Sequence, residues 1–204
     1  MIRTGSDSRG QHLASPTITV FDLEYTAWEC SMARRWLAPG EFKEVVQIGA
    51  VKLDADSFTI LAEFDVLVRP RINHSLSPYF EKLTGISTAM VARTGCDFEK
   101  AYDRFLNFAG EGPIAAFGRD ERVLEHNLRL YGIAGARPLP PFYDLRGWFA
   151  ALGLDPRGLH SCDLAPALGL TFAGRIHNAL DDARAIANAM AAMAPRGAPL
   201  RPAA

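Results

Sequence analysis

The chain has 204 residues, 49% of them hydrophobic and 22% charged, which suits one domain with a sizeable core. Its formal net charge of −1 argues against a broad electrostatic surface for long nucleic-acid duplexes but allows a small site for a chain end. We expect a single domain at residues 16–194, because residues 1–15 and 195–204 are polar or rich in proline and glycine and predict disordered tails.

Cysteine spacing and hydropathy limit the expected compartment. Cys30, Cys96 and Cys162 are odd in number and lack CxxC spacing, which indicates neither a disulfide framework nor a zinc site. No apolar run approaches the roughly 20 residues that a membrane span needs, and the N-terminal segment lacks a signal-peptide core. We therefore expect a soluble cytoplasmic protein with no membrane partner, and the sequence leaves its protein partners open.

Three strand-like segments begin the predicted fold. Residues 17–24 alternate around a β-rich run, and residues 45–53 and 59–70 predict two further strands. Asp54 to Ser57 predict the hairpin turn between the second and third strands. The segment 26–43 is longer than a simple strand turn.

Helical periodicity and short apolar runs then alternate along the chain. Asp97 is a plausible N-cap for one helix, and Gly132 ends another. The expected helices are 77–86, 87–94, 97–110, 120–131, 146–152, 161–168 and 179–193, and the expected strands are 113–117 and 141–145. This order predicts an α/β fold in which a mixed sheet, with three antiparallel strands followed by parallel strands, carries helices on both faces.

Two carboxylates share one face of the first predicted strand. Asp22 and Glu24 lie at alternate positions in line with Ile18 and Val20, the apolar side of the strand. Taken alone, such a pair also fits a frayed strand end that faces water. Hard cations such as Mg²⁺ prefer oxygen ligands, so the inward pair indicates a candidate metal site.

Helical spacing selects one acid from a second pair. Asp120 aligns with the apolar residues Leu124 and Leu128, whereas Glu121 aligns with Glu125 and Arg129 and is expected on a solvated stripe. Asp120 is therefore expected to face the sheet. A simple N-cap role remains possible for Asp120, because the N-terminus of a helix favours negative charge.

The final predicted helix contains a third acidic pair. Asp182 lines up along the helix with the apolar residues Ile186 and Met193, whereas Asp181 lies on a more polar side of the helix. Asp182 is therefore expected to point inward. His177 lies five residues before Asp182, and on a continuous helix the two side chains would point about 140° apart. His177 is therefore expected in the loop before the helix, from which it can reach back over the site. An imidazole pKa near neutrality suits a base that takes a proton from water, although a lone histidine is often structural.

These motifs resemble a known enzyme group. FDLE, an Asp at a strand-to-helix junction and HNALDDA are similar to the three motifs of the DEDDh 3′-to-5′ exonucleases, which have a ribonuclease H-like fold. EVVQIGAVKL, LVRPRINHSLSPYFEKLTGIS and LGLTFAGRIHNALDDARAIA resemble its enhanced-RNAi and histone-mRNA 3′ exonuclease subgroup and bacterial relatives. The similarity covers residues 17–193.

The resemblance implies roles for specific residues. By position, Asp22, Glu24, Asp120 and Asp182 would hold two Mg²⁺ or Mn²⁺ ions, and His177 would be the general base. The expected reaction releases nucleoside 5′-monophosphates from the single-stranded 3′ end of RNA, favoured here over DNA. The resemblance assigns candidate substrate contacts to Leu23, Leu83, Thr84 and Phe117, although Leu83 and Phe117 are equally compatible with ordinary core packing.

The sequence departs from the group in two places. Phe117-Gly118-Arg119-Asp120 is one residue shorter than the usual second motif, which leaves Glu121 as the alternative ligand. The long segment 26–43 adds Arg34, Arg35 and Trp36 beside the site and is a candidate lip over the substrate entrance.

Three other functions are compatible with parts of the pattern. They are a DNA-trimming or proofreading-type exonuclease, a non-catalytic nucleic-acid-binding module of the same fold, and a scaffolding domain. A non-catalytic module predicts a broken set of motif residues, but all five positions are filled. A scaffold must explain three separate acidic sites that face inward.

Overall fold

The structure is a computed structural model that describes residues 15–194. One mixed sheet lies at its centre, with the strand order β3-β2-β1-β4-β5. The strands are β1 (Thr17–Tyr25), β2 (Val45–Asp54), β3 (Ile60–Leu67), β4 (Ile114–Ala116) and β5 (Phe142–Asp144). The predicted tails, 1–15 and 195–204, lie outside the described residues except for Ser15.

Strand directions confirm the predicted mixed sheet. β1 pairs antiparallel with β2, and β2 pairs antiparallel with β3. β4 and β5 continue the sheet from β1 in parallel. The turn after β2 is closed by Asp54, whose carboxylate accepts hydrogen bonds from the Asp56 and Ser57 backbone amides at 3.2 and 2.8 Å, as expected of an Asx turn.

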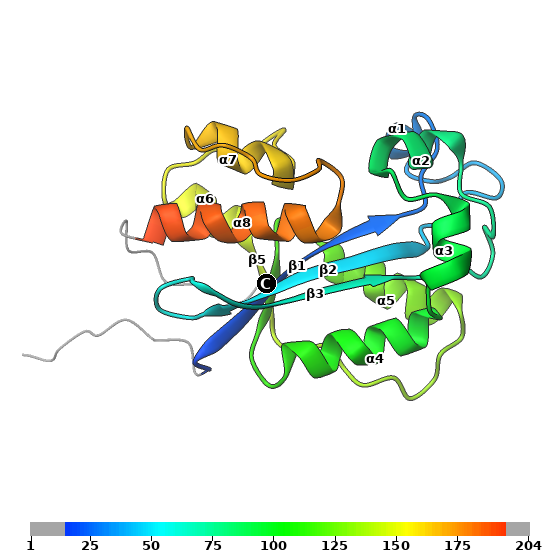
Figure 1. The fold of residues 1–204 in the computed structure, drawn as a ribbon, viewed down its shortest axis with the longest axis horizontal. Helices are drawn as coiled ribbons and strands as arrows, with labels where there is room; N and C mark the ends of the chain where they lie inside the picture. The colour runs from blue at the N-terminus through cyan, green and yellow to red at the C-terminus, as the bar shows by residue number, and fades with distance from the viewer. Residues whose placement is uncertain (1–14, 195–204) are drawn as a thin grey trace, which may run out of the picture.

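Helices cover both faces of the sheet, as predicted. One face packs against α6 (Leu145–Ala151), α7 (Leu164–Ala167) and α8 (Ala179–Met193), and the other against α4 (Phe98–Ala109) and α5 (Asp120–Leu130). Figure 1 shows α8 and α4 on opposite sides of the strands. In α4 the side chains of Phe98, Tyr102 and Phe105 are buried at helical spacing, and that of Phe108 is partly buried, so the aromatic face of this helix packs on the sheet.

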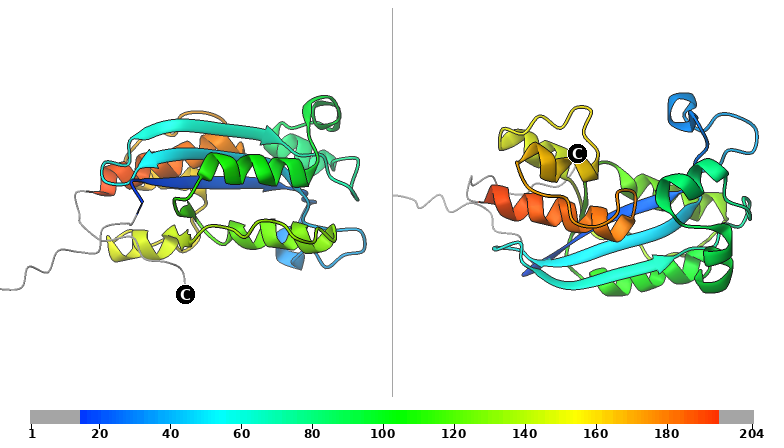
Figure 2. Two further views of the ribbon diagram at one scale, coloured as in Figure 1. Left: turned by 90° about the horizontal axis from the view of Figure 1, so that it is seen from below. Right: turned by 45° about the horizontal axis from the view of Figure 1, so that its top comes forward.

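Three short helices lie near the C-terminal end of β1. They are α1 (Ser31–Arg34), α2 (Pro78–Thr84) and α3 (Thr88–Thr94). The left view of Figure 2 separates α1 from α2 on the two sides of this end of β1. The helices α2 and α3 were predicted, whereas α1 lies within the segment 26–43, for which no helix was predicted. The structure adds that the side chains of Ser77 and Ser87 cap α2 and α3.

Two local predictions were less accurate. Asp97 occupies the N-cap position of α4, but its side chain makes no capping hydrogen bond there. The single helix predicted at 161–168 is instead a 3-10 turn, η1 (Ser161–Asp163), followed by α7. The Asp163 amide closes this turn on the His160 carbonyl at 3.0 Å, an i to i+3 bond that tightens the chain before α7.

The described residues also bear on the membrane and cysteine predictions. Between residues 15 and 194, no helix has both the length and the apolar character that crossing a bilayer requires. Cys30, Cys96 and Cys162 carry free thiols.

Candidate active site

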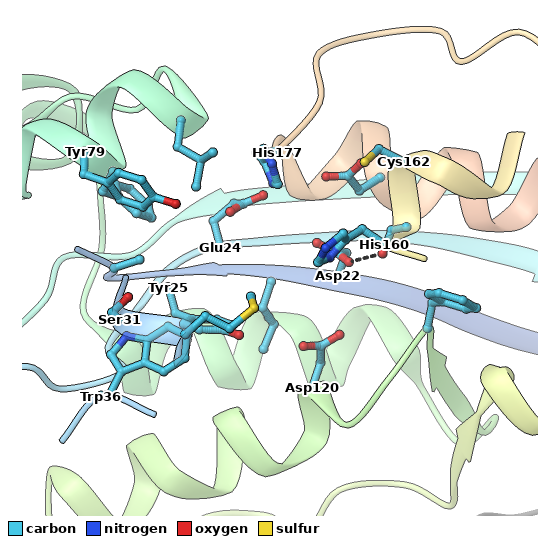
Figure 3. Close-up of a pocket in the computed structure, with 18 of the residues that line it drawn as sticks. Asp22, Glu24, Tyr25, Ser31, Trp36, Tyr79, Asp120, His160, Cys162 and His177 are labelled. Atoms are coloured by element: carbon cyan, nitrogen blue, oxygen red, sulfur yellow. Dashed lines mark hydrogen bonds between the residues drawn. The ribbon is translucent and has the colours of Figure 1, made fainter. Parts of the chain in front are cut away.

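The C-terminal half of β1 brings two acids into a pocket. Ile18 and Val20 are fully buried on the face that α8 covers, and Asp22 and Glu24 continue that face toward the strand end. Both carboxylates line a pocket of about 530 Å³. The predicted face of Asp22 and Glu24 is therefore confirmed (Figure 3).

The first turn of α8 brings a third acid to the same pocket. Asp182 is 4% exposed and lines the pocket, whereas Asp181 turns away and pairs with Arg184 at 2.7 Å. The predicted choice of Asp182 over Asp181 as the inward residue is confirmed. Helical periodicity succeeded here because α8 buries one continuous stripe against the sheet.

His177 lies in the loop before α8, as the sequence predicted. Its backbone has a φ of 60°, the left-handed region that non-glycine residues adopt rarely and mostly where the surrounding structure requires it. One ligand atom each from Glu24, His177 and Asp182 lie within 4.8 Å of one another. Thus residues from β1, a loop and α8 form one cluster, although Glu24 precedes the other two by more than 150 positions in the sequence.

Close packing at β2 allows this cluster to form. Gly49 is paired with Asp22 in the sheet, and a Cβ added at Gly49 would lie 2.1 Å from the backbone nitrogen of Leu180 in α8. Next to it, Gln47 accepts a hydrogen bond from the Ala179 amide at 3.0 Å. An amide at the start of a helix has no intrahelical partner, so Gln47 caps α8 from the strand. Gly49 and Gln47 together hold the first turn of α8 against β1 and β2.

A second set of bonds fixes the loop that contains His177. The Arg175 guanidinium donates to the Thr84 carbonyl at the end of α2, at 2.7 Å. The Arg175 amide donates to the Asp181 carboxylate at 2.8 Å. Arg175 therefore connects the His177 loop both to α2 and to α8, and Asp181 has a structural role next to the site.

Asp120 and Glu121 occupy different positions at the start of α5. Asp120 lines the pocket, and Glu121 is not among the lining residues. The expectation that Glu121 lies on a solvated stripe was wrong, because Glu121 is 6% exposed and accepts a hydrogen bond from Arg119 at 2.6 Å. Burial of an acid that is paired with a neighbouring arginine cannot be inferred from the polarity of its helix face.

The carboxylates strongly perturb one another. Burial, and then the charge of Asp182, raise the pKa of Asp22 to about 8. Burial also raises the pKa values of Glu24 and Asp120, and the charges of nearby carboxylates raise them further. Burial raises the pKa of Asp182 to about 7. Four acids that are costly to ionise together form a site that a cation would stabilise.

The donor atoms fit a divalent cation. Oδ1 of Asp182 is buried and has no hydrogen-bond partner among the described residues, which is costly unless another group binds it. Carboxylate oxygens are the ligands that Mg²⁺ and Mn²⁺ prefer. The cluster therefore meets the chemical requirement for the metal that the sequence predicted.

The predicted substrate contacts fall into two groups. Leu83, Phe117 and Leu23 line the pocket, although Leu23 and Phe117 are also at most 5% exposed and pack in the two cores. Thr84 is not brought to the pocket, because its hydroxyl is used inside the chain: it donates to the Phe80 carbonyl at 3.0 Å and accepts from the Ile86 amide.

The segment 26–43 forms one wall of the pocket, but only part of its predicted contribution is present there. Trp36 lines the pocket and rests against Tyr25, with 5.5 Å between ring centroids. Arg34 and Arg35 do not line it, and Arg34 pairs with Glu41 at 2.5 Å. The exposed side chain of Met32 stands at the same wall.

Several lining residues carried no usable sequence signal. Ser161 donates a hydrogen bond to Oδ1 of Asp22 at 2.9 Å, and His160 and Cys162 flank it in the pocket. Tyr79 and Arg146 also line the pocket, from α2 and α6. These residues lie on short helices or turns, where a period of 3.6 cannot be established from a few positions.

Comparison with known proteins places this geometry in a family. A family model described as Exonuclease, RNase_T, matches residues 19–190. The chain is 32% identical over 162 residues to a putative bifunctional exonuclease/endonuclease protein of Mycobacterium tuberculosis, covering 74% of this chain and 23% of that protein. It is 26% identical over 172 residues to human ERI1 exoribonuclease 3, covering 76% of this chain and 49% of that protein.

A solved structure shares the fold. The nuclease domain of 3′hExo, described as a DEDDh family member bound to rAMP, superposes with a TM-score of 0.78 at 22% identity, covering 94% of this chain and 98% of that chain. The fold is therefore the predicted ribonuclease H-like one. The chain spans half or less of the curated relatives named above. With a family model that matches most of its length, the chain belongs to the exonuclease family.

Proposed function

We propose that this protein is a metal-dependent 3′-to-5′ exonuclease that hydrolyses single-stranded nucleic acid, with RNA favoured over DNA, to nucleoside 5′-monophosphates. The observation that carries the proposal is the cluster of Glu24, His177 and Asp182, whose ligand atoms lie within 4.8 Å of one another. Asp22 and Asp120 complete the acidic side of the same pocket.

In the proposed site Asp22, Glu24, Asp120 and Asp182 would hold two Mg²⁺ or Mn²⁺ ions. When bound, such ions supply positive charge that stabilises the scissile phosphate and both reacting oxygens. Ser161 keeps the Asp22 carboxylate in one orientation through its hydrogen bond. The docking of α8 on Gly49 and Gln47 keeps Asp182 opposite Glu24.

His177 is the proposed general base. Burial lowers the pKa of His177, and the nearby His160 adds to the effect, so the imidazole is neutral near pH 7 and can accept a proton from the attacking water. Arg175 fixes the loop that carries His177 to the end of α2. The base is thus tied to the helix that forms the apolar wall of the pocket.

RNA is the favoured polymer because the human relative is called an exoribonuclease and the solved structure is described as bound to rAMP. The apolar wall that contains Leu83 and Tyr79 offers a surface on which a base of either polymer could stack. A DNA-trimming exonuclease is the alternative, because a contact to the 2′-hydroxyl decides between the two polymers.

The test is a panel of 5′-labelled and 3′-labelled single-stranded RNA and DNA incubated with Mg²⁺, Mn²⁺ or EDTA. We expect metal-dependent shortening from the 3′ end, 5′-monophosphate products and faster cleavage of RNA. No metal-dependent shortening of either polymer would refute the enzyme assignment, and faster cleavage of DNA would select the alternative. Thermal denaturation supplies a readout that is independent of activity, since Mn²⁺ should raise the melting temperature of the wild type and not of Asp182→Asn.

A further inference from the structure

One cationic side chain faces the acidic pocket. Among the lining residues Arg146 is the only arginine or lysine, and it belongs to the first turn of α6. Its guanidinium carbon lies 5.4 Å from the ring centroid of Phe117, a buried residue of the core. This aromatic contact holds the exposed guanidinium at the pocket wall.

Other arginines around the site are already paired. Arg34 pairs with Glu41, Arg119 with Glu121 at 2.6 Å, and Arg184 with Glu63 and Asp181. The guanidinium of Arg146 has no ion-pair partner within residues 15–194, although its charge lowers the pKa of Asp120. Arg146 is therefore near the carboxylates without being neutralised by any of them.

The location of Arg146 relative to the proposed base indicates which part of a substrate it meets. Figure 3 shows His177 and Asp120 on opposite sides of Asp22. In an in-line displacement the attacking and leaving oxygens lie on opposite sides of the phosphorus. If water is activated at His177, the leaving 3′-oxygen departs on the side of Asp120. Arg146 lies on this side, because its guanidinium carbon is 3.4 Å from the position of a Cβ added at Gly118, two residues before Asp120. The rest of the strand extends from that oxygen toward its 5′ end.

Charge balance indicates the same contact. Two divalent ions would carry four positive charges against the four carboxylates of the pocket, so Arg146 is the further cation among the lining residues that the phosphates of the strand can meet. We propose that Arg146 binds the phosphate on the 5′ side of the penultimate nucleotide, one phosphodiester upstream of the bond that is cleaved. The planar guanidinium suits this role, because it can donate two parallel hydrogen bonds to phosphate oxygens. This proposal rests on the proposed exonuclease function.

Two dinucleotides isolate this contact. UpU contains only the scissile phosphate, whereas pUpU adds the phosphate that Arg146 would bind. If the protein cleaves only DNA, the dinucleotides TpT and pTpT replace UpU and pUpU. We expect the wild type to prefer pUpU over UpU in kcat/KM by about 10-fold, the effect of one charge-assisted hydrogen bond. Arg146→Gln should bring the ratio of kcat/KM on pUpU to kcat/KM on UpU down to about 1, while Arg146→Lys should retain part of the preference.

The controls distinguish this role from a structural one. Arg129→Gln removes another exposed arginine, from α5 and outside the pocket, and should keep the wild-type preference. On longer oligonucleotides, Arg146→Gln should reduce the slope of log kcat/KM against log salt by about 0.7, the value for one single-strand phosphate contact. Equal losses on UpU and pUpU, or an unchanged preference, would overturn the proposal. If the wild type cleaves no substrate, the proposed exonuclease function itself fails.

Discussion

The carboxylate half of the pocket is built on regular elements, β1 and the first turns of α5 and α8, whereas the outer half is built on residues 26–43 and α2. Asp182 is 4% exposed, and Met32 at the outer wall is 65% exposed. Cys30 and Trp36 of the outer wall have left-handed backbones, which regular elements avoid, and His177 in the loop before α8 shares this conformation. This contrast predicts that changes in the inner half alter the chemical step and that changes in the outer half alter substrate binding.

The strongest test of the inner half is the pair Asp182→Asn and Asp181→Asn. We expect Asp182→Asn to lower kcat by more than about 100-fold, since even residues that only support a metal ligand cost 10-fold to 100-fold. Asp181→Asn should cost less than about 10-fold, because it weakens the Arg175 anchor and removes no ligand. Steady-state kinetics on a single-stranded oligonucleotide measure both, and equal losses would show that Asp181 belongs to the site.

Gly49→Ala tests whether the docking of α8 controls the inner half. The added methyl would lie 2.1 Å from the Leu180 nitrogen, so α8 must move. We expect a loss of about 1–3 kcal/mol in the free energy of unfolding, the usual cost of overpacking. A displacement near 1 Å at His177 and Asp182 should lower kcat by about 100-fold.

The matched control is Gly147→Ala in α6. No atom lies within 4 Å of a Cβ added at Gly147. Alanine is the better helix former, so the free energy of unfolding should rise by up to about 1 kcal/mol. Denaturant unfolding measures both variants. A Gly49→Ala protein as stable and active as Gly147→Ala would show that the close contact with α8 is not required.

Ser161→Ala tests the orientation of one carboxylate. The change removes the hydrogen bond of 2.9 Å to Asp22 and leaves the carboxylate in place. We expect the Mn²⁺ concentration for half-maximal activity to rise by about 10-fold, the lower end of the range for groups that support a metal ligand. Ser161→Thr keeps a hydroxyl and should recover part of the loss. An unchanged metal dependence would show that Asp22 is oriented without Ser161.

Tyr79→Ala tests the outer half and should have the smallest effect. Tyr79 lines the pocket at 42% exposure, so its removal costs little packing. We expect KM to rise by about fivefold through lost base stacking, with kcat and the melting temperature unchanged. Leu37→Ala is the control, because Leu37 is 81% exposed and does not line the pocket. A fall in kcat would contradict the proposed division between the two halves.

Periodicity predicted most of the fold and the inner half of the site. Strand alternation placed Asp22 and Glu24 on the face of Ile18 and Val20, and helical spacing selected Asp182 over Asp181. Both predictions depend only on the direction of a side chain relative to the axis of its own element. The error at Glu121 shows the limit, since pairing with Arg119 buries an acid that its neighbours predict to be exposed.

By itself, the sequence determined the order of strands and helices, the inward faces and the resemblance of three short motifs. Only the tertiary structure decided that Gly49 lets α8 approach the sheet, that Ser161 reaches Asp22, and that Arg146 lies beside the acids with no ion-pair partner in the described part of the chain. The physical reason is that these contacts join segments up to 139 positions apart. Their distances follow from how whole elements pack against one another, which the local pattern of a single element does not specify.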